Sequence, residues 1–127
     1  MKSPAAILSM DSYGGLIVGV LTLALYSFLT GFYNWSLDFL LFVGVANLVY
    51  GCYSGILLWR FRRTGVVSLA GVIILVIFNS IWAGHCLTQI WYQWETWTFF
   101  GINHLALEAA YVSFLAFVEC RYVLLRD

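Results

Sequence analysis

The chain has 127 residues, of which 63% are hydrophobic and only 9% are charged, and its six basic and six acidic residues give a net charge of zero. A soluble domain carries about 25% charged residues, so a composition this apolar, with a mean hydropathy of +0.91, excludes a soluble fold and predicts an integral membrane protein. Because no run of basic residues could follow a phosphate backbone, nucleic acid is excluded as a partner. The partner that the composition predicts is the lipid bilayer.

Four apolar segments are long enough to cross a bilayer as helices. A spanning helix needs about 20 mainly apolar residues, and segments of this length run over about 13–32, 37–59, 66–91 and 99–125. The residues before the first segment, Asp11 among them, are expected to form a short lead-in at the membrane surface. Because the connections are short, neighbouring helices must run antiparallel. The sequence therefore predicts one all-α integral membrane domain over 1–127, a four-helix transmembrane bundle of up-down-up-down topology.

The basic residues all fall on one side of this predicted bundle. They lie before the first helix, between the second and third, and at the end of the fourth: Lys2, Arg60, Arg62, Arg63, Arg121 and Arg126. Short loops that carry Arg and Lys stay in the cytoplasm during insertion. The opposite side instead gathers aromatic residues, which are typical of a belt at the outer boundary: Tyr33, Trp35, Trp91, Tyr92, Trp94 and Trp97. We therefore predict a multi-pass protein of the cell membrane with both termini in the cytoplasm.

Small residues form stripes at helical spacing on the first two helices. The first helix offers Gly15 and Gly19, and the second offers Gly44, Gly51 and neighbouring small residues. In lipid, where apolar burial does not drive helices together, close packing depends on such residues. The stripes predict packing inside one bundle, with a homo-oligomer or a membrane protein partner as the alternative.

The predicted third and fourth helices carry polar residues inside the spans. His85 and His104 lie almost equally far from the turn near Glu95, so an antiparallel hairpin places both imidazoles at similar depth. Glu108 follows His104 by one turn and shares its face. An ionisable residue inside a span costs several kcal/mol unless it is paired, which makes it a functional candidate. We therefore predict that His85, His104 and Glu108 converge in the outer half of the bundle.

Three amides complete this predicted site, and one acid is left out of it. Gln89 lies one turn outward from His85, Asn79 lies deeper on the same helix, and Asn47 lies on the second helix. Glu119 is expected to face lipid headgroups at the inner boundary, with Arg121. The candidate ligand-binding or proton site thus consists of His85, His104, Glu108, Asn47, Asn79 and Gln89.

Several functions are compatible with this site. The first is a polar pocket open to the outer side that binds a small ligand or a partner, such as a quinone, a lipid headgroup, a proton or a small substrate. The second is a redox or metal-dependent membrane enzyme, because two imidazoles and a carboxylate at His85, His104 and Glu108 suit zinc or iron. A fourth metal ligand would have to be Cys86 or water, and a haem between the imidazoles is tight at the usual helix spacing of about 8–10 Å. The third is a proton-coupled carrier with Glu108 as its proton site. No catalytic motif decides among them, so the sequence names no catalytic residue, no cofactor and no enzyme class.

Two segments and the end of the chain carry a resemblance to known proteins. Residues 46–54, Ala-Asn-Leu-Val-Tyr-Gly-Cys-Tyr-Ser, residues 104–111, His-Leu-Ala-Leu-Glu-Ala-Ala-Tyr, and the Glu-Cys-Arg of residues 119–121 resemble a group of uncharacterised small bacterial four-helix integral membrane proteins. The resemblance covers the last three helices. It implies the architecture and a bacterial inner membrane, and it implies no activity.

Overall fold

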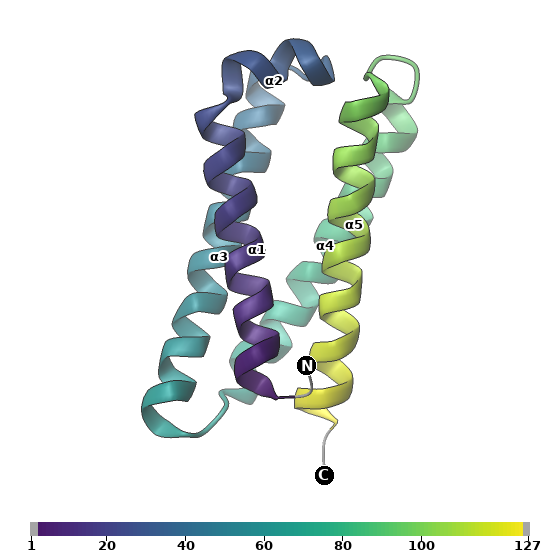
Figure 1. The fold of residues 1–127 in the computed structure, drawn as a ribbon. Coiled ribbons are helices and arrows are strands. Elements are labelled where there is room, and N and C mark those ends of the chain that lie inside the picture. The colour runs from purple at the N-terminus through teal and green to yellow at the C-terminus, as the bar shows by residue number, and fades with distance from the viewer. Residues whose placement is uncertain (1–2, 126–127) are drawn as a thin grey trace.

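The computed structural model describes residues 3–125, and helices make up nearly all of this part of the chain. They are α1 (Pro4–Ala24), α2 (Tyr26–Tyr33), α3 (Leu37–Thr64), α4 (Leu69–Gln93), α5 (Phe99–Glu119) and the π-helical turn η1 (Cys120–Leu124). Four helices are long and apolar enough to cross a membrane: α1, α3, α4, and α5 continued by η1. Successive long helices run in opposite directions, and α1 begins at the end of the bundle where η1 ends (Figure 1). The predicted all-α four-helix bundle is confirmed.

The first span begins earlier than the sequence predicts. The Ser3 side chain caps α1 by accepting a hydrogen bond from the Ala6 backbone N–H, and Pro4 fits the first turn because its missing N–H would have no partner there. The expected surface lead-in is therefore helix, and Asp11 and Ser12 are buried in the bundle. The prediction was wrong because polar residues were assigned to the surface, whereas these two find partners inside.

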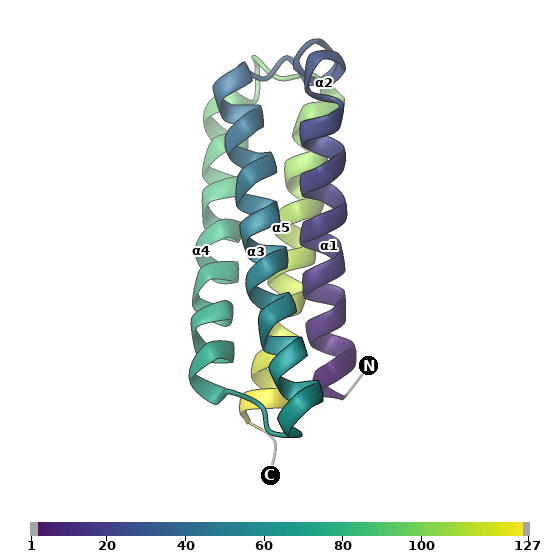
Figure 2. The same cartoon turned by 90° about the vertical axis from the view of Figure 1, so that its left-hand side faces the viewer.

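The first span also ends earlier than predicted, and a short helix follows it. After Leu25 the chain turns into α2, which lies across one end of the bundle (Figures 1 and 2). Asn34 ends α2 in the left-handed conformation, with φ of 56°. Two hydrogen bonds join the C-terminal end of α2 to the α4–α5 connection. Asn34 Nδ2 donates to the Thr96 carbonyl at 2.7 Å, and Thr98 Oγ1 donates to the Phe32 carbonyl at 2.7 Å. These bonds hold the end of α2 over the top of α5.

The other spans differ from the prediction mainly at the opposite end. Helix α3 continues to Thr64, so Arg62 and Arg63 lie in its last turn and not in a loop, and Gly65 ends it with φ of 72°. The α-helical part of the last span stops at Glu119, where the backbone widens into the π-helical turn. The arginines of α3 and η1 lie at the end where α1 begins (Figure 1). Lys2 and Arg126, which the topology prediction also uses, lie outside the described residues.

The glycine stripes form the seam between α1 and α3. A Cβ on Gly15 would lie 2.7 Å from the Asn47 carbonyl oxygen, and a Cβ on Gly51 would lie 2.7 Å from the Leu16 backbone nitrogen. Since real Cβ atoms do not approach backbone this closely, the two helices meet only because these positions are glycine. The stripes therefore serve packing within one chain, as the first of the two alternatives predicted.

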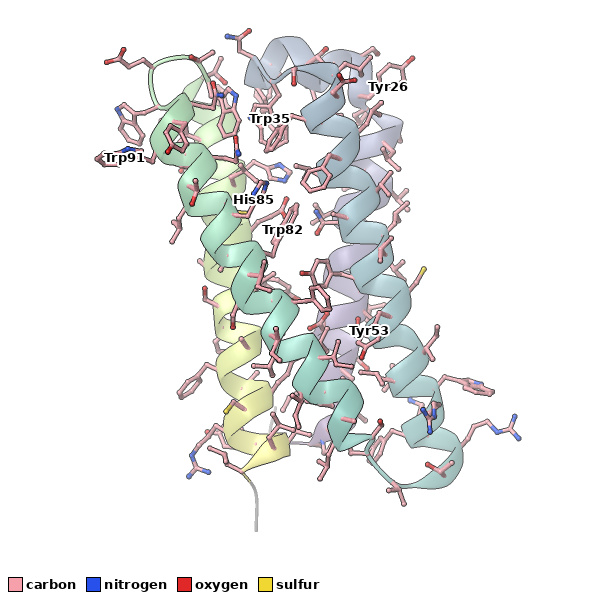
Figure 3. All side chains as sticks on the ribbon, turned by 180° about the vertical axis from the view of Figure 1, so that it is seen from behind. Tyr26, Trp35, Tyr53, Trp82, His85 and Trp91 are labelled. Atoms are coloured by element: carbon pink, nitrogen blue, oxygen red, sulfur yellow. The ribbon has the colours of Figure 1, made fainter. Side chains whose placement is uncertain are left out.

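The aromatic residues at the predicted outer end divide into two groups. Trp91, Tyr92 and Trp94 are exposed, as a boundary belt requires, whereas Trp35 and Trp97 are buried in an apolar cluster with Leu40, Val43, Cys86 and Leu105. Figure 3 shows Trp35 and Trp82 pointing into the bundle and Trp91 pointing out of it. Trp35 and Trp97 were wrongly assigned to the belt, because closeness to a loop does not decide which side of a helix end a ring occupies.

Candidate functional site

Glu108 is the centre of a hydrogen-bonded cluster that joins four helices. Its side chain is 8% exposed. Oε1 accepts from the indole N–H of Trp82 on α4 at 2.9 Å and from Nδ2 of Asn47 on α3 at 3.1 Å. Oε2 faces Nε2 of His104, one turn earlier on α5. The carboxyl group is therefore surrounded by polar partners from α3, α4 and α5, as a buried acid in a span requires.

Tyr33 extends this cluster from α2. Its hydroxyl group lies 2.9 Å from Nδ1 of His104, and its ring packs edge-on against the imidazole. We assign the hydrogens so that Glu108 Oε2 accepts from His104 Nε2 and the Tyr33 hydroxyl donates to His104 Nδ1, a pattern in which each of these donors has an acceptor. Burial, and then the negative charge of Glu108, raise the pKa of the Tyr33 hydroxyl above its ordinary value, so this donor keeps its proton. Tyr33, His104 and Glu108 thus form a continuous hydrogen-bonded chain.

The predicted convergence of His85, His104 and Glu108 is met by two of the three residues. His85 instead packs its ring against Trp82 and Phe42, with centroid distances of 5.4 and 5.7 Å, and its buried Nε2 has no hydrogen-bond partner among residues 3–125. Trp82 is the link, since its ring contacts His85 (Figure 3), while its indole N–H donates to Glu108 Oε1. Equal depth on two helices does not give a common direction, and here the bulky indole occupies the space between the imidazole and the carboxyl group.

The amide candidates have separate positions. Asn47 joins Glu108, whereas Asn79 binds a different pair of acids deeper in the bundle. In the part of the chain that the structure describes, no hydrogen bond connects Gln89 to either group. The same residues contain no set of three His, Cys, Asp or Glu side chains placed to hold a metal ion, so the His85–His104–Glu108 metal site lacks its geometric basis.

A second polar cluster, which the sequence did not predict, lies toward the opposite end. Asn79 Nδ2 on α4 donates to Oδ2 of Asp11 on α1 at 3.0 Å and to Oε1 of Glu119 on α5 at 3.1 Å. Glu119 is fully buried, and Asp11 is 3% exposed. The expectation that Glu119 faces headgroups was therefore wrong.

Spacing could have revealed both acids. Asp11 precedes Gly15 and Gly19 by one and two turns, on the face that packs against α3. Glu119 follows Glu108 by three turns of helix, which returns it to the same face. Nearness to the ends of the predicted spans hid this pattern.

A cavity of about 600 Å³ connects the two polar clusters. Tyr33, His104 and Glu108 line it near the end of the bundle that α2 covers, and Asp11 and Asn79 line it toward the opposite end. Between them the wall is mainly aromatic and apolar: Gly14, Gly15, Ile17, Val18, Tyr50, Trp82, Leu107, Tyr111, Val112 and Leu115. Ile17 on α1 and Leu107 on α5 are exposed at this wall, at 57% and 70%, so the cavity opens between α1 and α5 on the side that faces lipid.

Fold and site together define a multi-pass membrane protein with an internal cavity that is acidic at two places along its length. Comparison of the chain with protein-family models, with curated protein sequences and with solved structures found no match. The geometry of the cavity is therefore the basis for any function assigned to this chain.

Proposed function

We propose that this protein binds a small, uncharged amphipathic molecule that enters the cavity from the bilayer between α1 and α5. The cavity is the main support for this proposal. It is a space of about 600 Å³ within the spans, open toward lipid and lined by polar groups at both clusters. Ligand sites of about 300–1,000 Å³ are typically apolar with a few placed polar groups, and this cavity has that form.

The lining supports a ligand that carries a ring or a short chain with a hydrogen-bonding group. Trp82, Tyr50 and Tyr111 offer aromatic surface in the middle of the cavity. The Tyr33 hydroxyl, whose proton is directed at His104, offers an acceptor oxygen toward the α2 end of the cavity. A small aromatic alcohol fits this combination, because its flat face packs on the aromatic wall while its hydroxyl group donates to the Tyr33 oxygen.

The orientation of the chain is part of this proposal. In the described part of the chain the arginines Arg60, Arg62, Arg63 and Arg121 lie in the last turns of α3 and in η1. Short basic ends stay in the cytoplasm, so we place this end inside the cell and the Glu108 cluster in the outer half of the bilayer. A bacterial inner membrane, which the resemblance implies, is the membrane that we propose.

Photolabelling tests the binding site and does not require the identity of the natural ligand. The probe is a diazirine derivative of benzyl alcohol, photolysed with the protein in lipid bilayers, and labelled residues are identified by mass spectrometry. We expect labelling at Leu107 and Tyr111, suppressed by excess benzyl alcohol, because both line the cavity. Saturable labelling distinguishes a cavity from the lipid face, where labelling grows with probe concentration without competition.

A matched pair of variants on α1 provides the control. Val18→Trp should remove the saturable labelling, because Val18 lines the cavity and an indole would fill its middle. Val20→Trp adds the same side chain at a position that is 55% exposed on the lipid side, so labelling should stay as in the wild type. Saturable labelling of Leu107 that survives Val18→Trp, or labelling that excess benzyl alcohol does not reduce, would rule out this site.

A further inference from the structure

Asp11 and Glu119 bring two carboxyl groups together in the interior of the spans. Both accept a hydrogen bond from the same nitrogen, Nδ2 of Asn79, at 3.0 and 3.1 Å. Because both oxygens contact one nitrogen, the two carboxyl groups lie next to each other. Two ionised carboxylates have only acceptors, so a hydrogen bond between them requires a proton on one of them.

One oxygen of this pair points to the position of that proton. Glu119 is fully buried, and its Oε2 is a buried atom with no donor among the residues that the structure describes. An oxygen in this position is satisfied if it carries a proton and donates it to Asp11. A buried acceptor with no donor is rare in native structures and needs an explanation.

Among residues 3–125, the groups that face the pair from the neighbouring helices supply no donor besides Asn79 and no compensating positive charge. Tyr50 on α3 donates its hydroxyl to the Phe78 carbonyl, and Tyr111 on α5 donates its hydroxyl to the Met10 carbonyl. On α4 the facing group is Asn79. The Arg121 guanidinium of η1 stacks over the Tyr122 ring at 5.5 Å and is exposed. Within residues 3–125, the contact between a carboxyl group and a basic side chain is that of Glu108 with His104, and it lies at the other cluster.

We propose that Asp11, Asn79 and Glu119 form a proton-binding site in which one proton, carried by Glu119 Oε2, is shared with the Asp11 carboxylate. Like charges at this separation in a medium of low dielectric disfavour double ionisation, and two carboxyl groups that share a site retain a proton between them. Asp11 and Asn79 line the cavity, which gives the proton a route to exchange.

A proton fits this site better than a metal cation. A bound cation needs electron-pair donors on all sides, whereas Asn79 turns its amide nitrogen, a donor, toward both carboxyl groups. The site is separate from the Glu108 cluster, and its proton does not depend on whether an amphipathic ligand binds. Failure of either proposal would therefore leave the other unaffected.

Infrared spectroscopy of the protein in lipid bilayers tests the site directly. A protonated carboxylic acid has a C=O stretching band well separated from carboxylate bands. We expect this band in the wild type at neutral pH, and we expect carbon-13 labelling of glutamate to shift it, which assigns the proton to a Glu without any substitution. Glu119→Gln should remove the band. Glu108→Gln, the matched control at the other cluster, should leave it in place.

A second measurement uses the wild type alone and therefore does not depend on whether the variants fold: the free energy of unfolding is recorded as a function of pH. In the wild type the folded pair holds a proton that exposed carboxyl groups have lost at neutral pH, so the folded state binds more protons and stability must fall as pH rises. Sodium ions should not change this dependence of stability on pH. Absence of a protonated-acid band at neutral pH, its persistence in folded Glu119→Gln, or stability that rises with sodium concentration in place of this pH dependence would each overturn the proposal.

Discussion

Replacing Glu108 in two ways separates its hydrogen bonds from its charge. In Glu108→Ala, the Trp82 indole N–H and His104 Nε2 lose their partner, while Asn47 Nδ2 keeps its second bond to the Val43 carbonyl at 2.9 Å. An unsatisfied buried polar group costs about 1–3 kcal/mol, so two such groups predict a loss of about 2–6 kcal/mol. The lower half of this range is the better expectation, because interhelical hydrogen bonds in membranes contribute about 0.6–2 kcal/mol each.

Glu108→Gln should behave differently because the amide can replace every bond. Its oxygen takes the place of Oε1 and accepts from Trp82 and Asn47, and its NH₂ group faces His104 Nε2. The imidazole must then accept at Nε2 and donate from Nδ1 to the Tyr33 oxygen, so the neutral tautomer reverses. We expect a loss of stability below about 1 kcal/mol, within the range of a single interhelical bond.

Two measurements check this expectation. Unfolding in mixed micelles with increasing dodecyl sulfate gives the free energy of unfolding for the wild type and both variants. Nitrogen-15 NMR of histidine-labelled protein reports which ring nitrogen of His104 carries the proton, and Glu108→Gln should move it from Nε2 to Nδ1. The reasoning fails if Glu108→Ala is as stable as Glu108→Gln, or if the tautomer of His104 is the same in the wild type and in the Gln variant.

The remaining predictions concern packing and orientation. Gly51→Ala should reduce the free energy of unfolding by roughly 1–3 kcal/mol, the usual effect of overpacking, because its Cβ would lie 2.7 Å from the Leu16 backbone nitrogen. Gly84→Ala on α4 is the control, since a Cβ there meets nothing within 4 Å. Equal stability of the two variants would contradict the α1–α3 seam. Reporter fusions should place the connection after Arg63 in the cytoplasm, and an active periplasmic phosphatase at that position would reverse the proposed orientation.

The architecture could be predicted from the sequence because it follows from a strong physical constraint. A polypeptide in lipid must satisfy its backbone hydrogen bonds within each segment, so four long apolar segments allow little except four helices. The glycine stripe around Gly51 was also readable, since close approach in lipid depends on small residues. Glu108 and Asn47 were found because ionisable and amide groups inside a span need partners.

The errors share one physical cause. Asp11 and Glu119 lie near the ends of apolar segments, and polarity near a segment end was taken to mean contact with water or headgroups. The structure shows instead that α1 begins at Pro4, which carries Asp11 well inside the span and beside Asn79. His85 illustrates the complementary difficulty, because its depth could be predicted while its direction depends on how the Trp82 ring packs.

The two acidic clusters also explain how the halves of the bundle are held together. The α1–α3 seam is a contact of backbones, yet α1 and α3 meet α4 and α5 around a cavity, where apolar packing is incomplete. Glu108 bonds α3 to α4 and α5, while Asn79 joins Asp11 of α1 to Glu119 of α5. Uncharged amides could form such bridges at lower risk of an unpaired charge in lipid. What a carboxyl group adds is the ability to gain and lose a proton, and that property is the one that the Gln variants at positions 108 and 119 remove while keeping the bridges.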